Sequence, residues 1–199
     1  MSTEFILESP LVGLQPGPGQ LLRHAGKQDV ELLERPFTQS AILRAKPESA
    51  AANSLSSTLG LQLPTVPNTV SHGNEVKALW LSPEEWLICA SENYSGNLVG
   101  TLEEVFSGTF HAVVDQSNGN STIDLRGTDT RAILNTGCPL DLHPSVFKKD
   151  QCAQSVFFQA GIILSALSAD GSHWELVVRR SFADYVAQML VDAIDLQGV

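Results

Sequence analysis

One short segment places a cysteine and a histidine close together in the chain. Cys138 and His143 are the only such pair, and a thiolate activated by an imidazole is a common enzymatic nucleophile. Asp141 lies between them, and a negative charge beside a thiol disfavours the reactive thiolate. Pro139 and Pro144 stiffen the segment. We therefore interpret residues 137–147 as a rigid loop that packs or docks, because a rigid loop loses little entropy on binding.

Two carboxylates form a second candidate site. Asp115 ends one predicted strand and Asp124 lies in the next, and two facing carboxylates could share acid–base work. The alternative is that Asp115 caps the polar turn at residues 116–120. Trp80 and Trp86 could stack on a flat ligand such as a pterin, or they could anchor a core or an interface.

Other catalytic and binding motifs are missing from the sequence. The glycines at residues 17–19 follow no predicted strand and enclose Pro18, so we reject them as a dinucleotide loop. There is no G-x-S-x-G nucleophile motif, and the five histidines are too widely spaced for a local metal pair. We predict no catalytic, cofactor-binding or metal-binding residue in this chain.

Composition restricts the class of protein. The chain has 199 residues, 43% of them hydrophobic, and a net charge of −10 at pH 7. It can bury a full core, and without a basic stripe it does not suit nucleic acid or an anionic membrane as a partner. The acidic N-terminus is not a signal peptide, and no window has the roughly 18 apolar residues of a membrane span. We expect a cytoplasmic protein with reduced thiols at Cys89, Cys138 and Cys152.

The chain divides into an N-terminal arm and one larger unit. Residues 11–20 mix apolar residues with Pro and Gly, a pattern that sustains neither helix nor strand. We predict an extended arm over residues 1–28 that docks on a partner. Residues 29–199 predict a mixed α+β domain, with a mainly antiparallel sheet and packed helices, and a division into two subdomains is left open.

Periodicity predicts the elements of this domain. Strand patterns occupy residues 30–46 with a break at Pro36, and residues 76–81, 86–90, 110–115, 121–125, 152–158, 161–167 and 174–178. The last three strands should form a meander. Helical spacing covers residues 49–61, 98–106 and 128–136, and a final helix is predicted with Ser181 as its cap. Its apolar face is predicted to contain Phe182, Tyr185, Val186, Met189, Leu190, Ala193 and Ile194.

A series of short segments carries a family resemblance through its number and order. The segments cover residues 34–37, 60–64, 79–87, 114–117, 125–127, 137–144, 152–154 and 180–185. They include Leu-Trp-Leu-Ser-Pro-Glu-Glu-Trp-Leu, Gly-Cys-Pro-Leu-Asp-Leu-His-Pro and Arg-Ser-Phe-Ala-Asp-Tyr. With these segments the chain resembles the gamma subunit of heterotetrameric sarcosine oxidase. That family is similar in fold to the folate-binding aminomethyltransferase of glycine cleavage, the T-protein.

The resemblance implies a subunit rather than a complete enzyme. It implies a complex that oxidises sarcosine to glycine with O2, giving H2O2 and, with tetrahydrofolate, 5,10-methylenetetrahydrofolate. The implied partners are the alpha, beta and delta subunits, which would hold FAD, FMN, NAD and zinc. No cofactor is implied for this chain. Residues of the T-protein folate pocket cannot be carried over, because no matching motif is present.

The leading hypothesis is a non-catalytic structural or assembly subunit. One alternative is a stand-alone folate-binding or aminomethyl-transfer protein that uses Trp80 or Trp86 for stacking, with Asp115 or Asp124 as the polar partner. A second alternative is a free-standing assembly factor. The predicted partner interface combines the arm with the proline-bracketed loop, through Leu11, Leu14, Leu140, Leu142, His143, Pro144 and Phe147.

Overall fold

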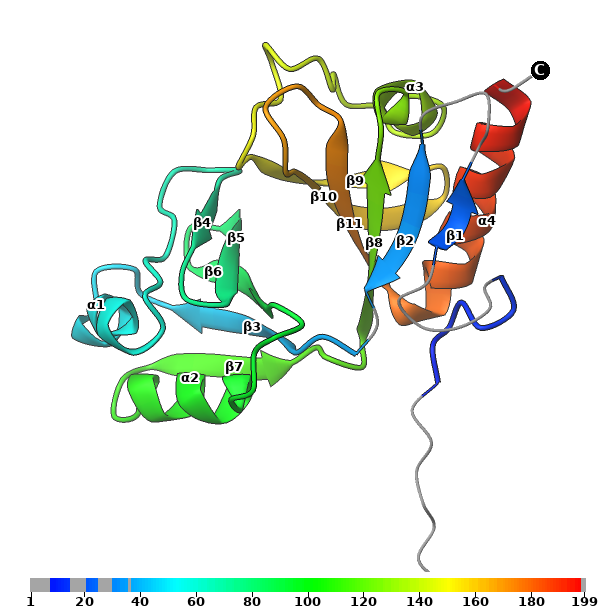
Figure 1. Cartoon of the computed structure of the whole chain (residues 1–199). Helices are drawn as coiled ribbons and strands as arrows, with labels where there is room; N and C mark the ends of the chain where they lie inside the picture. The colour runs from blue at the N-terminus through cyan, green and yellow to red at the C-terminus, as the bar shows by residue number, and fades with distance from the viewer. Residues whose placement is uncertain (1–7, 15–20, 25–29, 36, 198–199) are drawn as a thin grey trace, which may run out of the picture.

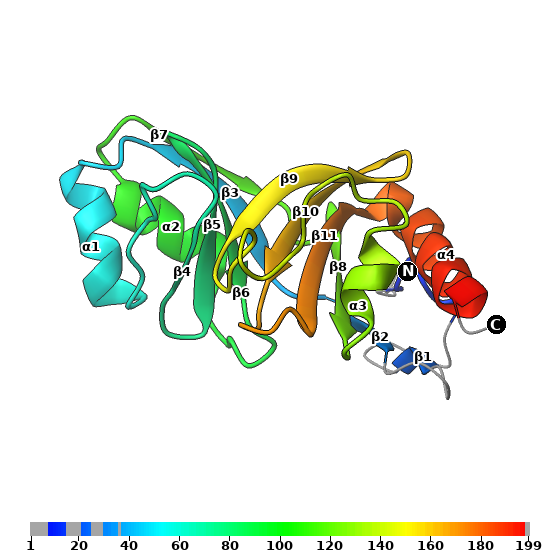
Figure 2. The same cartoon turned by 90° about the horizontal axis from the view of Figure 1, so that it is seen from above.

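The computed structural model describes residues 8–14, 21–24, 30–35 and 37–197. Within these residues, two antiparallel sheets lie face to face, and helices cover the outer side of each sheet (Figures 1 and 2). The result is a four-layer arrangement in the order helix, sheet, sheet, helix. This matches the predicted α+β class with antiparallel sheet and packed helices.

The first sheet has six strands in the order β1-β2-β8-β11-β10-β9, and α3 and α4 lie against it. The second has five strands in the order β4-β5-β6-β3-β7, covered by α1 and α2. The bounds in the first sheet are β1 Leu21–His24, β2 Glu31–Arg35, β8 Asn120–Arg126, β9 Cys152–Phe157, β10 Ala160–Ala166 and β11 His173–Arg179, with α3 Thr130–Leu134 and α4 Arg180–Gln197. Those in the second are β3 Ser40–Ala45, β4 Val70–His72, β5 Val76–Ser82, β6 Glu85–Ala90 and β7 His111–Asp115, with α1 Ala50–Thr58 and α2 Leu98–Phe106.

The five-stranded sheet is formed by one continuous piece of chain. Its strands and helices all lie within residues 40–115, between β2 and β8 of the other sheet. The two strands that flank this piece, β2 and β8, pair with each other, with Arg35 opposite Thr122. The chain therefore leaves the six-stranded sheet once, completes the second sheet, and returns beside its point of departure.

Local chemistry explains where two of the helices begin. The side chain of Ser49 accepts a hydrogen bond from the Ala52 amide at the start of α1, and that of Asn97 accepts one from the Gly100 amide at the start of α2. Such caps satisfy amides that have no partner inside the helix. The predicted helix start at Ser49 is therefore confirmed, as is the pairing of β9, β10 and β11 in a meander.

Several predictions differ from the structure in detail. Ser181 lies inside α4, which begins at Arg180, and Phe182 is 44% exposed instead of facing the core. The buried face of α4 contains Ala183, Val186, Ala187, Leu190, Ala193 and Ile194. The predicted helix near residues 128–136 is confined to the five residues of α3. The strands at 110–115 and 121–125 do form, but β7 and β8 belong to different sheets.

The predicted N-terminal arm is folded onto the domain wherever the structure describes it. Leu21–His24 is strand β1 and pairs with β2 at the edge of the six-stranded sheet. Residues 10–14 form turns, and Leu11 is fully buried in the core beneath α4. The prediction of an extended, separate arm is therefore corrected for these segments. The other residues of the range 1–28 lie outside the described residues.

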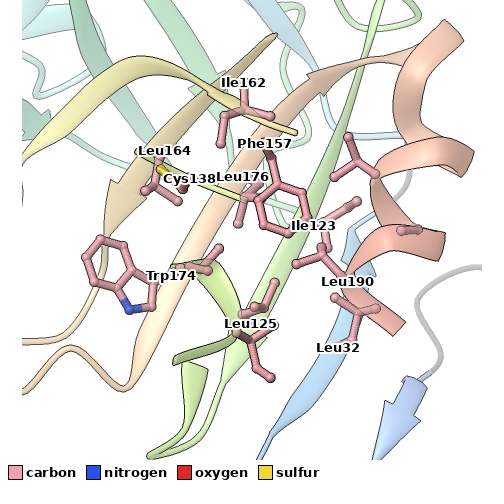
Figure 3. Close-up of a cluster of buried hydrophobic side chains, with 14 of the residues drawn as sticks. Leu32, Ile123, Leu125, Cys138, Phe157, Ile162, Leu164, Trp174, Leu176 and Leu190 are labelled. Carbon is pink, nitrogen blue, oxygen red and sulfur yellow. The ribbon is translucent and has the colours of Figure 1, made fainter. Parts of the chain in front are cut away.

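Each sheet has its own apolar core on its helical side. The larger core contains Trp174, Phe157 and Leu176 from the six-stranded sheet and Leu190 from α4 (Figure 3). The other core joins Trp86 and Ile88 to side chains of α1 and α2. The outer face of each sheet thus packs against its own helices. The two inner faces pack against each other, and they form a third apolar cluster between the sheets.

Candidate functional site between the two sheets

The middle of the space between the sheets is apolar. Leu79 and Leu87 from the five-stranded sheet pack with Cys152 and Val177 from the six-stranded sheet, and all four are buried. Strand alternation places these side chains opposite the helical cores, because neighbouring residues of a strand point to opposite faces. This apolar contact holds the two sheets together.

A cluster of charged side chains lies at one end of this space. It comprises Arg35, Lys77, Asp124, Arg126, His173 and Glu175, which we call the ion cluster. Its two carboxylates are almost completely buried and lie on adjacent strands, with Asp124 of β8 directly opposite Glu175 of β11. Five of the six residues come from the six-stranded sheet, and Lys77 alone comes from the other sheet.

Every carboxylate oxygen of the ion cluster has a cationic or imidazole partner. Arg35 donates to Asp124 Oδ1 from Nε at 3.1 Å and from Nη2 at 2.8 Å, and its Nη2 also donates to Glu175 Oε2. Lys77 Nζ lies 2.6 Å and 2.5 Å from the two oxygens of Glu175. On the far side of Asp124, Oδ2 lies 3.2 Å from Arg126 Nη2 and 3.4 Å from His173 Nε2.

These surroundings change the proton affinities of the groups. Burial by itself would raise the pKa of Asp124, but the hydrogen bond to His173 and the charge of Arg35 outweigh it and lower the pKa to about 2. Burial lowers the pKa of Lys77 to about 8. Burial also raises the pKa of the Cys89 thiol and brings that of Cys152 to about 11. The acid is therefore firmly ionised, whereas the two thiols are held in the protonated form.

The predicted carboxylate pair does not form. Asp115 lies on β7 in the other sheet, where its Oδ1 accepts a hydrogen bond from the Ser117 amide at 2.8 Å. This is the turn-capping alternative. The carboxylate that faces Asp124 is Glu175, which sequence reasoning missed. Its signal was a single acidic residue inside an otherwise apolar strand, where an unpaired charge would be costly.

The two tryptophans have structural contacts. Trp86 is fully buried in the core beneath α1 and α2 and donates a hydrogen bond from Nε1 to the Pro64 carbonyl at 2.8 Å. Trp80 lies opposite Trp86 on the neighbouring strand and packs against the same core. The core-anchoring alternative therefore describes both residues, and the face of Trp86 is not accessible to a ligand.

The proline-bracketed loop does not bring Cys138 and His143 into contact. Cys138 is buried with its sulfur 3.9 Å from Ser155 Oγ, whereas His143 is exposed and its Nδ1 lies 2.7 Å from Ser145 Oγ. The buried thiol packs in the large core and the imidazole completes a turn. A thiol–imidazole nucleophile is not assembled here.

The predicted partner interface is corrected for two of its residues. Leu11 and Leu142 are buried in the core of this chain, so they have no surface to offer a partner. Leu14, Leu140 and Phe147 are partly buried against the same core. His143 is exposed and Pro144 half-buried. A role for these last five residues in contacting a partner stays a prediction.

Two further structural findings concern metals and membranes. Within the described ranges, no three His, Cys, Asp or Glu side chains gather in a way that could hold a metal ion. Among the helices of the same ranges, none combines the length and the apolar character needed to cross a bilayer.

Comparison with known proteins decides the family. A family model described as "Sarcosine oxidase, gamma subunit family" matches residues 44–195. The chain belongs to this family. It is 30% identical over 171 residues to the sarcosine oxidase subunit gamma of Corynebacterium sp. strain U-96, covering 85% of this chain and 82% of that protein.

Solved structures agree with this assignment. A chain of the heterotetrameric sarcosine oxidase of Corynebacterium sp. U-96, solved in complex with pyrrole 2-carboxylate, superposes with a TM-score of 0.84 at 28% identity, covering 96% of each chain. The glycine cleavage aminomethyltransferase T of Bartonella henselae superposes with a TM-score of 0.65 at 15% identity, covering 94% of this chain and 57% of that one. The second likeness confirms the predicted aminomethyltransferase-like fold.

Proposed function

We propose that this chain is the gamma subunit of a heterotetrameric sarcosine oxidase, and that it serves the complex as a non-catalytic structural subunit. The observation that carries the proposal is the end-to-end likeness to a chain of the Corynebacterium complex, which covers 96% of both chains. The two chains therefore share one fold over almost their whole aligned lengths.

The ion cluster supports a structural rather than a catalytic role. Its two buried carboxylates are held by Arg35, Lys77, Arg126 and His173, and a general base must instead present a free lone pair to a substrate. The cluster also connects strands of both sheets. We therefore interpret it as a device that fixes how the two sheets pack.

The proposed partners are the alpha, beta and delta subunits of the oxidase, and the proposal assigns FAD, FMN, NAD and zinc to those subunits. It also places the complex in the cytoplasm, and the three free cysteines of the chain are consistent with a reducing compartment. The reaction of the complex would be the oxidative demethylation of sarcosine with O2.

The stand-alone folate-binding alternative gains no support from the residues on which it depended. Trp86 is buried, Trp80 packs against a core, Asp115 caps a turn, and Asp124 is engaged in the ion cluster. Binding of tetrahydrofolate by the isolated chain would have to use other residues.

Co-expression tests the proposal. The tagged chain should co-purify with the other three subunits in fixed stoichiometry, and the eluate should show flavin absorption and sarcosine-dependent peroxide formation. A parallel preparation without this chain should yield less complex with a lower Tm. A complex that assembles without it, at full activity and with the same Tm, would contradict the structural role. Calorimetry of the isolated chain with tetrahydrofolate should show no binding.

A further inference from the structure

A row of apolar side chains crosses the inner face of the five-stranded sheet. The strand register places Val70, Leu79, Leu87, Ile42 and Val114 opposite one another in turn, on β4, β5, β6, β3 and β7. Residues directly opposite in antiparallel strands have side chains on the same face. We call these five residues the apolar row.

The six-stranded sheet covers only part of the apolar row. Leu79 and Leu87 in the middle are fully buried under Val177 and Cys152. Ile42, one strand further, is half-buried, and Val114 on β7 is 50% exposed. The apolar row therefore extends one strand beyond the area that the six-stranded sheet covers.

The exposed apolar surface continues along β7. Ala112 lies opposite Arg44 and Val114 opposite Ile42, so both point to the inner face, and both are exposed. Phe110, directly before β7, is 96% exposed. A phenylalanine in such a position is a candidate interface anchor, because aromatic side chains contribute much of the binding energy of interfaces. We call Phe110, Ala112 and Val114 the β7 stripe.

Two adjoining hollows flank the β7 stripe and share Glu85. One, of about 510 Å³, is lined by Phe110 and Ala112. The other, of about 580 Å³, is lined by Ile42 of the five-stranded sheet, by Ile163 and Val177 of the six-stranded sheet, and by Phe182 of α4. Phe182 is one of the α4 residues whose side chains are exposed. Apolar side chains thus look into this space from both sheets.

The charges around these hollows differ in sign from those of the whole chain. Their linings contain three cationic residues, Arg44, Lys46 and Arg179, and two carboxylates, Glu84 and Glu85. This lining therefore has a net charge of +1 on a chain whose net charge is −10. Arg44 is paired with Glu85 at 2.8 Å, whereas Lys46 and Arg179 have no ion-pair partner among the residues that the structure describes. The surface is complementary to a partner that carries acidic residues.

The backbone of β7 offers a further means of binding. β7 is the edge of its sheet, and in the described part of the chain no strand pairs with its outer side. An unpaired edge presents backbone N–H and C=O groups that can take up another strand.

We propose that the outer edge of β7 takes up an extended segment of a partner subunit as a sixth strand of this sheet. The segment would place alternate apolar side chains beside the β7 stripe on the inner face and direct acidic side chains towards Lys46 and Arg179. This inference rests on the proposed function, since it names where the complex meets this chain. It differs from the predicted interface at the proline-bracketed loop, and the two surfaces can be tested against each other.

Three matched valine substitutions separate the possibilities. Val114→Lys places a charge on the β7 stripe, Val146→Lys places one on the proline-bracketed loop, and Val66→Lys serves as a neutral site. The three side chains are 50%, 56% and 63% exposed, so each variant should fold, and a thermal melt of the isolated chain verifies this. We expect Val114→Lys to weaken assembly with the other three subunits at least about tenfold, because a lysine would be desolvated in the interface.

Assembly should be measured by titrating each variant into the complex of the other three subunits. Equal assembly by Val114→Lys and wild type would overturn the inference, as would a loss confined to Val146→Lys. If the wild-type chain fails to assemble, the proposed function itself fails, which is a different result. A dimer of the isolated chain that Val114→Lys converts to a monomer would identify a second copy as the occupant and would also overturn the inference.

Backbone hydrogen exchange gives an independent readout. Amides of residues 111–115 on the open side of β7 should exchange quickly in the isolated chain and become at least about tenfold slower in the assembled complex, because strand addition hydrogen-bonds them. Residues 143–147 should change little. Unchanged exchange at β7 in a complex that does assemble would exclude strand addition.

Discussion

At one end of the space between the sheets, Glu175 and Asp124 are buried among charged partners, and at the other end Val114, on the inner face of β7, is exposed. The first end is polar and closed, since every carboxylate oxygen there is paired. The second end is apolar and open, and Val114 is 50% exposed. Both ends depart from the usual distribution, in which charges lie in water and large apolar patches are covered.

The difference between the two ends lies in where the partners of their side chains come from. Buried charges require partners from the same chain, because an unpaired one is costly during folding. Exposed apolar groups do not prevent folding, and contact with another chain can bury them later. We therefore expect substitutions at the polar end to act on the stability of the isolated chain, and substitutions at the open end to act on assembly.

The largest effect should come from removing one carboxylate of the polar end. Glu175→Leu leaves Lys77 and Arg35 near a buried apolar side chain, and the free energy of unfolding should fall by about 3–5 kcal/mol. Urea unfolding of the isolated chain measures this. The matched control is Glu85→Leu, which breaks the more exposed pair with Arg44 and should cost less than about 1 kcal/mol. Similar losses for both variants would show that burial does not distinguish the pairs.

The apolar row permits a comparison of its covered and uncovered parts. Leu87→Ala removes a fully buried side chain and should lower the free energy of unfolding by about 3 kcal/mol through lost burial and cavity formation. Val114→Ala should change it by less than about 0.5 kcal/mol, because the side chain is half exposed already. If Val114→Ala destabilised the isolated chain as much as Leu87→Ala, the open end would belong to the folding core.

Acid should weaken the polar end through Asp124. Its pKa is about 2 in the folded chain against an ordinary 3.8, so the stabilisation is complete above pH 3.8 and is lost as the pH falls towards 2. Between pH 5 and pH 2 the wild type should lose about 2 kcal/mol more than Asp124→Asn, a variant of nearly the same size. Parallel stability curves for the two proteins would contradict the lowered pKa.

The smallest effect is alkaline and comes from Lys77. Its folded-state pKa of about 8 lies below the ordinary 10.5, so above pH 8 the unfolded chain binds more protons and the stability contribution of this group rises with pH. From pH 8 to pH 9 the wild type should gain about 1 kcal/mol relative to Lys77→Met. Denaturant melts at the two pH values suffice, and a relative loss in place of a gain would show that Glu175 raises the pKa of Lys77.

The sequence was informative about local structure because helix caps and strand alternation are local signals. The start of a helix at Ser49 was predicted from its spacing, and the strands on either side of Pro36 were both predicted. The assignment of β7 and β8 to different sheets was not predicted, since a polar turn between two strands looks the same in either case.

The ion cluster escaped sequence reasoning for a physical reason. Arg35 and Asp124 are 89 residues apart, and Lys77 and Glu175 are 98 apart. No periodicity or spacing connects groups at such separations, because strand order across two sheets brings them together. Asp124 was singled out, but with Asp115 as its partner. The apolar row cannot be predicted from sequence patterns either, because its five residues come from five different strands.

The single excursion of the chain into the second sheet has an evolutionary consequence. The segment of residues 40–115 enters and leaves at one place, where the Gln116 amide donates to the Ser40 carbonyl at 2.8 Å and Ala41 lies opposite Asp115. A segment whose ends meet can be exchanged as a cassette without altering the register of the host sheet. Related chains could therefore exchange the whole five-stranded sheet, with its binding surface, as one segment. The pairing of β2 with β8 would stay unchanged.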